Sequence, residues 1–242
     1  MKIAIISDIH SNLEALLAVE EHMMDLGVDS IYFVGDVVGY GPDPNECARW
    51  VMDKTELAVM GNHDQAALGL LDVETFNPSA KQAILWNSSH MESWATEYLR
   101  TLPLTQVRQD VTLVHANPRD PEGWNYIFTL WDAEMNFQHF EGTFCFVGHS
   151  HQPVAVMMNG EGEVNVIATE SFPIERGSRY LINVGSVGQP RDGNPAACFG
   201  LLDTEKGEFS YVRTMYDFHK TQEKMFQASL PRSLAERLAE GR

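Results

Sequence analysis

Residues 2–10 read Lys2-Ile3-Ala4-Ile5-Ile6-Ser7-Asp8-Ile9-His10, a short β-branched run that ends in polar side chains. Such a run predicts a buried strand. Apolar residues at helical spacing follow over residues 13–23, behind the expected N-cap Ser11 and before Gly27, and they predict a helix. A strand that leads directly into a helix begins a series of stacked β-α units, so this stretch predicts an α/β fold.

The alternation of strand-like and helical segments continues along the chain. In the second half, short strand-like segments predominate. Strand-like runs recur at residues 31–34, 57–60, 105–114 and 144–147, with helical periodicity at residues 44–53, 80–102 and 132–140. Five short strands are then expected at residues 153–158, 164–169, 180–184, 197–203 and 208–215. We expect the second half to form an antiparallel sheet that packs face to face with a mixed sheet from the first half.

Length and composition restrict the class of protein. The 242 residues suffice for one large α/β domain, and we expect a single domain with a core over about residues 1–215 and a helical extension over residues 216–242. No apolar run approaches the roughly 20 residues that cross a bilayer, so no membrane partner is expected. The cysteines form no CxxC pair, and no signal-peptide pattern is present, which predicts a cytoplasmic protein.

The net charge is the unusual feature of the amino-acid composition. Seventeen basic residues face 34 acidic ones, which gives a formal net charge of −17. A surface that binds a nucleic acid polymer normally needs surplus lysine and arginine, and that surplus is absent here.

Residue types that bind metals follow five of the apolar runs. They are Asp8 and His10, then Asp36, then Asn62, His63 and Asp64, then His115, and finally His149 and His151. Loops at the carboxyl ends of parallel strands gather at one edge of a sheet, so these groups are expected together. The Asp-x-His and His-x-His spacings would direct both side chains the same way in extended backbone. Gly35, Gly61 and Gly148 would allow close backbone approach.

Each motif alone also has an ordinary structural interpretation. An Asp-x-His after a strand is commonly a turn, Asn62 or Asp64 could cap a helix, and His115 could be a packing histidine. Five such motifs in order, each at a strand end, favour a metal site. The remaining histidines lie in helical or tail stretches and are interpreted as surface or packing residues.

In order and approximate spacing, these motifs resemble those of the calcineurin-like metallophosphoesterases, over about residues 1–215. The segment Asn183-Val184-Gly185-Ser186-Val187-Gly188-Gln189-Pro190-Arg191 resembles the closing segment of the small prokaryotic members, which include phosphodiesterases and relatives of diadenosine tetraphosphatases. The resemblance implies a four-layer α-β-β-α sandwich of two mixed sheets flanked by helices. It also implies two divalent cations, for which Mn is favoured and Fe, Zn, Ni or Co are possible.

The resemblance further implies residue roles. One cation would be held by Asp8, His10, Asp36 and His151, and the other by Asp36, Asn62, His115 and His149, with Asp36 bridging. A metal-bridging hydroxide would attack phosphorus, and His63 would protonate the leaving group with Asp64 orienting its ring. Asn62 and Arg191 are the expected substrate contacts, and Arg119 is a further candidate.

The motifs are compatible with several classes of substrate. We expect a small phosphodiester or phosphomonoester, and the alternatives are a nucleotide pyrophosphohydrolase of diadenosine tetraphosphatase type or a non-catalytic protein-binding scaffold. The arginines typical of phosphoprotein phosphatases in this superfamily are missing. Trp124, Tyr126, Phe128 and Trp131 are interpreted as core packing, with a lid that stacks a nucleobase as the alternative.

Overall fold

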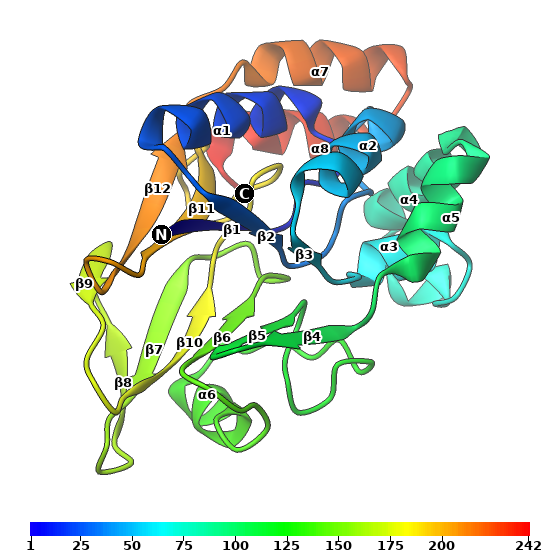
Figure 1. Cartoon of the computed structure of the whole chain (residues 1–242). Helices are drawn as coiled ribbons and strands as arrows, with labels where there is room; N and C mark the ends of the chain where they lie inside the picture. Colours follow the sequence, from blue (N-terminus) through cyan, green and yellow to red (C-terminus); the bar gives the residue numbers. More distant parts are fainter.

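Two six-stranded mixed sheets form the centre of the computed structural model, which describes residues 1–242 (Figure 1). The first has the order β3-β2-β1-β11-β12-β9, with β1 (Lys2–Ile6), β2 (Ser30–Phe33), β3 (Leu57–Ala58), β9 (Ser171–Pro173), β11 (Ala197–Asp203) and β12 (Glu208–Thr214). The second has the order β4-β5-β6-β10-β7-β8, with β4 (Thr105–Arg108), β5 (Val111–Val114), β6 (Phe144–Val147), β7 (Val154–Met158), β8 (Val164–Ile167) and β10 (Arg179–Asn183).

Helices cover the outer face of each sheet, so the predicted four-layer α-β-β-α sandwich is confirmed (Figure 1). On the side of the first sheet lie α1 (Leu13–Leu26), α2 (Pro44–Lys54), α3 (Asn62–Ala67), η1 (Val73–Thr75), α4 (Pro78–His90), α5 (Ser93–Thr101), α7 (Phe218–Gln227), α8 (Arg232–Glu236) and η2 (Arg237–Glu240). The second sheet is covered by α6 (Leu130–Asn136). No helix is both long enough and apolar enough to span a bilayer.

The strand β1 is buried on both faces, which explains its unbroken apolar sequence. Ile5 points into the core between the two sheets, where it joins Phe146 and Phe209. Its neighbour Ile6 points to the opposite face and joins Leu16 of α1. Burying such side chains stabilises the fold by roughly 1.5 to 3 kcal/mol each.

One prediction about the sheets is wrong, because each sheet takes strands from both halves of the chain. In the first sheet, β11 pairs antiparallel with β1, with Leu202 opposite Ile3. In the second, β10 pairs parallel with β6, with Ile182 opposite Phe146. Alternating hydrophobicity specifies which face of a strand is buried but not which strand lies beside it.

The end of the chain folds back toward the start. The helix α7 packs on α1, and Lys224 of α7 reaches the Glu14 carboxylate of α1 at 2.9 Å. Asn12, not the expected Ser11, caps α1 and accepts a hydrogen bond from the Ala15 amide at 3.2 Å. The Ser11 hydroxyl instead donates to Asn87 of α4 at 2.6 Å, which joins the loop before α1 to a helix that lies far away in the sequence.

Candidate metal centre

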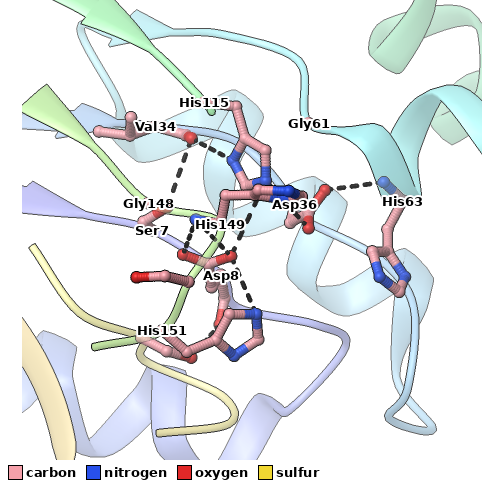
Figure 2. A network of polar contacts seen from close by, with 12 residues as sticks. Ser7, Asp8, Val34, Asp36, Gly61, His63, His115, Gly148, His149 and His151 are labelled. Atoms are coloured by element: carbon pink, nitrogen blue, oxygen red, sulfur yellow. Dashed lines mark hydrogen bonds and ion pairs between the residues drawn. The ribbon is translucent and has the colours of Figure 1, made fainter. Parts of the chain in front are cut away.

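The residues expected at strand ends come together at one edge, where the carboxyl ends of strands from both sheets meet (Figure 2). From the first sheet come Asp8 and His10 after β1, Asp36 after β2, and Asn62 and His63 after β3; from the second come His115 after β5 and His149 and His151 after β6. Backbone hydrogen bonds link the strand-end loops across the two sheets. The Gly188 amide, for example, donates to the Asp8 carbonyl oxygen at 2.8 Å.

The backbone at the two i, i+2 pairs is not extended, so the expectation that extended backbone directs each pair the same way is wrong. Asp8, His10, His149 and His151 all have left-handed φ angles, of 55°, 50°, 67° and 59°. Asp36 shares this conformation with a φ of 63°. Such a conformation costs a non-glycine residue about 1 kcal/mol or more and persists only where surrounding contacts enforce it. The chain therefore turns sharply at each strand end and aims these side chains inward.

All three predicted close approaches are confirmed, and a Cβ atom on Gly35 would lie 2.7 Å from His115 Nδ1. A Cβ atom on Gly61 would lie 2.0 Å from the Asp36 Oδ1 atom, and one on Gly148 would lie 2.0 Å from the Ser7 hydroxyl and 2.4 Å from Asp8 Oδ2. Glycine is required at the last two positions because neighbouring backbone packs directly against the buried carboxylates.

Hydrogen bonds to backbone carbonyl oxygens fix the tautomer of four histidines. The pairs are His10 Nδ1 with Val38 at 3.0 Å, His115 Nδ1 with Val34 at 2.7 Å, His149 Nε2 with Trp124 at 2.9 Å, and His151 Nδ1 with Gln189 at 2.6 Å. A carbonyl oxygen can only accept, so each ring donates its proton there. The other ring nitrogen of each histidine then presents a lone pair, the arrangement that orients metal-ligating histidines.

No hydrogen-bond donor lies opposite these lone pairs. The Nε2 atoms of His10 and His151 face each other at 3.2 Å, and the buried Nε2 of His115 has no hydrogen-bond partner. The Oδ1 atom of Asn62 is likewise buried without a partner. Lone pairs that face one another or a carboxylate repel unless a positive charge lies between them. The set therefore fits divalent cations that accept imidazole nitrogen and oxygen ligands.

Two buried carboxylates complete this set. Asp36 Oδ2 lies 3.2 Å from His115 Nε2 and 3.5 Å from His10 Nε2, and Asp8 Oδ1 lies 3.3 Å from His151 Nε2. Three groups of potential ligands result, namely Asp8 with His10 and His151, His10 with Asp36 and His63, and Asp36 with His115 and His149. Asp36 belongs to two of the groups, and one of its oxygen atoms lies between histidines of different groups.

The electrostatics of the centre show a strong preference for positive charge. Burial would raise the pKa of Asp36, but His115 and His63 hold it well below its ordinary value. Burial would lower the pKa of His115, and the Asp36 carboxylate instead raises it to about 9.

Asp64 does not contact the His63 ring as expected. Its carboxylate accepts hydrogen bonds from three backbone amides, those of Asp36 at 3.0 Å, Val38 at 3.1 Å and Gly61 at 3.0 Å. Asp64 thus holds the β2 and β3 loops together, and its side chain is directed away from the imidazole. The His63 backbone amide donates to Asp36 Oδ1 at 2.9 Å, and its ring lies 4.5 Å from that of Tyr40 and 5.0 Å from that of Phe76.

A pocket of about 630 Å³ opens over the centre. Its lining includes Asp36, Asn62, His63, His149, His151 and Arg191, all predicted site residues. Arg119 lies elsewhere, in a separate cavity of about 290 Å³. Asp8 and His115 are completely buried beneath the pocket, so they can reach only an ion and not a substrate.

The aromatic segment after His115 forms a wall of the pocket, and its interpretation as core packing is wrong. Tyr126, Phe128 and Trp131 are 44%, 65% and 63% exposed. Tyr126 stacks on His149 with ring centroids 4.1 Å apart, and Phe128 stacks on Tyr126 at 4.7 Å. Trp124 and Tyr126 line the pocket. The backbone turns outward here, which apolar composition alone does not reveal.

Sequence reasoning missed several residues of the pocket, among them Tyr40 and Arg237. The Tyr40 hydroxyl accepts a hydrogen bond from Arg191 Nη2 at 3.1 Å, and its ring packs against His10 and His63. Arg237, from η2 near the end of the chain, also lines the pocket. Tyr40 follows the Gly-Asp motif closely enough to have been considered. Arg237 belongs to no motif, and nothing in the sequence distinguishes it from other arginines of the tail.

Comparison with known proteins agrees with this arrangement. Residues 1–207 match the calcineurin-like phosphoesterase superfamily domain, and the chain belongs to that family. It is 41% identical over 246 residues to an uncharacterized protein of Methanocaldococcus jannaschii, with 99% of this chain and 98% of that protein covered. A metallophosphoesterase from Sphaerobacter thermophilus has the same fold, with a TM-score of 0.88, 39% identity, and coverage of 100% and 99%.

More distant relatives have names that state an activity. Phosphodiesterase YfcE of Escherichia coli is 25% identical over 218 residues, which is 85% of this chain and 89% of that protein. A symmetrical bis(5'-nucleosyl)-tetraphosphatase of Methylobacillus flagellatus is 30% identical over 135 residues, 54% of this chain and 45% of that protein.

Proposed function

We propose that this protein is a binuclear metal-dependent phosphoesterase that hydrolyses a small phosphodiester or phosphomonoester. The observation that supports this most directly is the set of inward lone pairs, above all the facing Nε2 atoms of His10 and His151 at 3.2 Å. A bound cation would relieve the repulsion between such facing lone pairs. A pocket with room for a small ester lies directly above it.

The family resemblance implies two ligand sets, and two of the observed groups of side chains support them. Asp8, His10, Asp36 and His151 would hold one cation, and Asp36, Asn62, His115 and His149 the other. Two bound cations supply a water of lowered pKa as nucleophile and offset the charge that develops on phosphoryl oxygens. Imidazole and carboxylate ligands without thiolate suit Mn, our preferred ion, and also Fe, Zn, Co or Ni.

His63 is proposed as the general acid. Its Nδ1 is buried without a partner, which leaves Nε2 as the ring atom that can reach a substrate in the pocket. Burial lowers the pKa of His63 well below its ordinary value. A proton acquired together with the anionic substrate would pass from Nε2 to the leaving oxygen, which completes cleavage of the P–O bond.

The chain's other polar groups would position the ester. Asn62 presents its amide at the pocket floor, and Arg191 is held by Tyr40 and by Gln189 Oε1 at 2.9 Å, so its guanidinium is ready to contact a phosphoryl oxygen. The local positive charge of the site would attract an anionic substrate despite the net charge of −17. We further propose a cytoplasmic enzyme formed by a single domain, with no nucleic acid polymer and no membrane as a partner.

A nucleotide pyrophosphohydrolase is the second candidate. The stacked rings of Tyr126 and Phe128 beside the pocket support it, because a nucleobase can stack on such a surface. The likeness to the Methylobacillus tetraphosphatase points in the same direction. A non-catalytic scaffold, the remaining alternative, would not explain why the complete set of candidate metal ligands is present.

The test is an activity assay on the purified chain loaded with Mn. The substrates are bis-p-nitrophenyl phosphate, p-nitrophenyl phosphate and diadenosine tetraphosphate, and elemental analysis measures the bound metal. We expect two metals per chain and turnover of at least one nitrophenyl ester. A preference for the tetraphosphate would favour the second candidate. Absence of turnover with Mn, Fe, Zn, Co and Ni alike would contradict the enzyme proposal.

A further inference from the structure

Two arginines of the pocket, Arg191 and Arg237, have guanidinium nitrogen atoms without a protein partner. Arg191 and Arg237 both line the pocket, and neither forms an ion pair with an aspartate or glutamate side chain. The buried Nε of Arg191 has no hydrogen-bond partner. Arg237 Nε donates to the oxygen of Arg242, the last residue of the sequence, and neither Nη atom has a protein acceptor. Partly buried guanidinium groups normally have an anionic partner.

The position of Arg237 is set by contacts on both sides of η2. Leu234 and Leu238 are buried in the same apolar cluster as Tyr40, the residue that holds Arg191. The Gly241 carbonyl oxygen accepts a hydrogen bond at 2.9 Å from the Gly193 amide, in the loop that follows Arg191. The end of the chain is thus docked onto the two elements that position Arg191, and Arg237 is no loose tail residue.

The charge around the two guanidinium groups is incompletely compensated. Burial, and then the positive charge of Arg191, lower the pKa of Arg237. The pocket lining includes only two carboxylates, Asp36 in the proposed metal centre and the exposed Glu122. An anionic ligand between the two arginines would relieve their repulsion, and the planar fork of a guanidinium matches phosphate geometry.

We propose that Arg237 and Arg191 form a second phosphate subsite, so that preferred substrates carry a phosphate group in addition to the one that is hydrolysed. This inference rests on the proposed function and narrows its substrate class to compounds with at least two phosphates, which for the second candidate include nucleoside diphosphates. It also assigns a binding role to the C-terminal segment, which contributes none of the proposed metal ligands.

The test compares two adenine nucleotides that differ by one phosphate. AMP and α,β-methylene-ADP, whose P–C–P bridge resists hydrolysis, are measured as competitive inhibitors of bis-p-nitrophenyl phosphate hydrolysis by the Mn-loaded chain. We expect the diphosphate analogue to bind about tenfold tighter or more, the size of a charge-assisted hydrogen bond. Arg237→Gln should remove most of that preference, and Arg237→Lys should restore part of it.

The control is Arg232→Gln, which removes an exposed arginine from α8, outside the pocket, and should leave the preference unchanged. Circular dichroism and thermal melting establish that each variant is folded. If Arg237→Gln is folded and keeps the wild-type preference for the diphosphate analogue, the proposal of a second phosphate subsite is wrong. The proposal of a phosphoesterase would be unaffected. If the wild type hydrolyses nothing, calorimetric binding of the two nucleotides to the Mn-loaded proteins still decides the subsite, because the ratio of their affinities gives the same comparison.

Discussion

The floor and the outer wall of the pocket are built in different ways. The floor consists of the strand-end loops that contain the candidate ligands. Asp8, Asp36 and His115 are at most 1% exposed there, and hydrogen bonds fix their side chains. The outer wall consists of residues 122–128 and of η2. Its side chains are partly exposed, and Arg237 makes a single hydrogen bond.

From this difference we expect the floor to determine catalytic activity and the outer wall to determine which substrate is bound. A floor of buried groups with left-handed backbone tolerates little change, because every group is positioned by several others. The outer wall can change its side chains while the sheets remain intact, and loops of this kind commonly determine which ligand is bound. Substitutions in the floor should therefore abolish activity, whereas those in the wall should change substrate preference.

The largest effect is expected for Asp36→Asn. This change removes the carboxylate shared by two ligand groups, so metal binding should fail and kcat/KM should fall on the order of 10³-fold or more. Elemental analysis and steady-state kinetics measure both quantities. Asp25→Asn, on the exposed side of α1, is the matched control. Two tightly bound metals in Asp36→Asn would refute the bridging assignment.

His63→Ala should keep the metals and yet slow the reaction. The loss should reach about 10²-fold or more for alkyl esters, which need a proton on the leaving oxygen, and should be much smaller for nitrophenyl esters. Rates for a series of esters of different leaving-group pKa provide the measurement. Equal losses across the series would eliminate His63 as the acid.

Gly148→Ala should weaken metal binding without removing any ligand. The added Cβ would overlap the Ser7 hydroxyl and Asp8 Oδ2, so the carboxylate must move. Metal affinity should drop by about 10- to 100-fold, the usual cost of disturbing the groups that orient a ligand. Metal titration followed by calorimetry measures the drop. Gly160→Ala, where a Cβ meets nothing closer than 3.8 Å, should behave as wild type.

The smallest effect is expected for a substitution at Lys224, which attaches the C-terminal helix α7 to α1. Lys224 Nζ contacts both Glu14 and Asp43, so Lys224→Met should lower the free energy of unfolding by about 1 to 2 kcal/mol at pH 7. Lys206→Met, which breaks no ion pair, is the control. Urea denaturation at several pH values measures the difference.

The pH dependence of this contact follows from Glu14. Burial opposes its ionisation, but Lys224 and Lys220 lower its pKa in the folded protein. A carboxyl group of lowered pKa stabilises the fold above its unfolded pKa, and this contribution is lost as the pH falls through the folded value. The difference between wild type and Lys224→Met should therefore shrink below about pH 4.5. Burial raises the pKa of Asp43 and Lys224 opposes this shift, so Asp43 contributes to the difference in the same direction as Glu14.

Much of the fold and of the candidate site could be predicted from the sequence, because the relevant information is local. The run that ends in Asp8 and His10 marks a buried strand and the edge where it stops. The glycines that precede Asn62 and His149 indicate where backbone must pass close to buried groups. The order of these motifs also identified the family that the comparison confirms.

Strand partners and side-chain directions could not be predicted, because they depend on contacts between distant segments. Periodicity did not reveal that β11 pairs with β1, and composition did not reveal that Tyr126 lies at the surface. The sequence alone determined which residue types stand at the strand ends, since a strand and its polar terminus are adjacent in the chain. Only the tertiary structure decided that Asp64 binds backbone amides and that Arg237 reaches the pocket, since both follow from how remote segments pack.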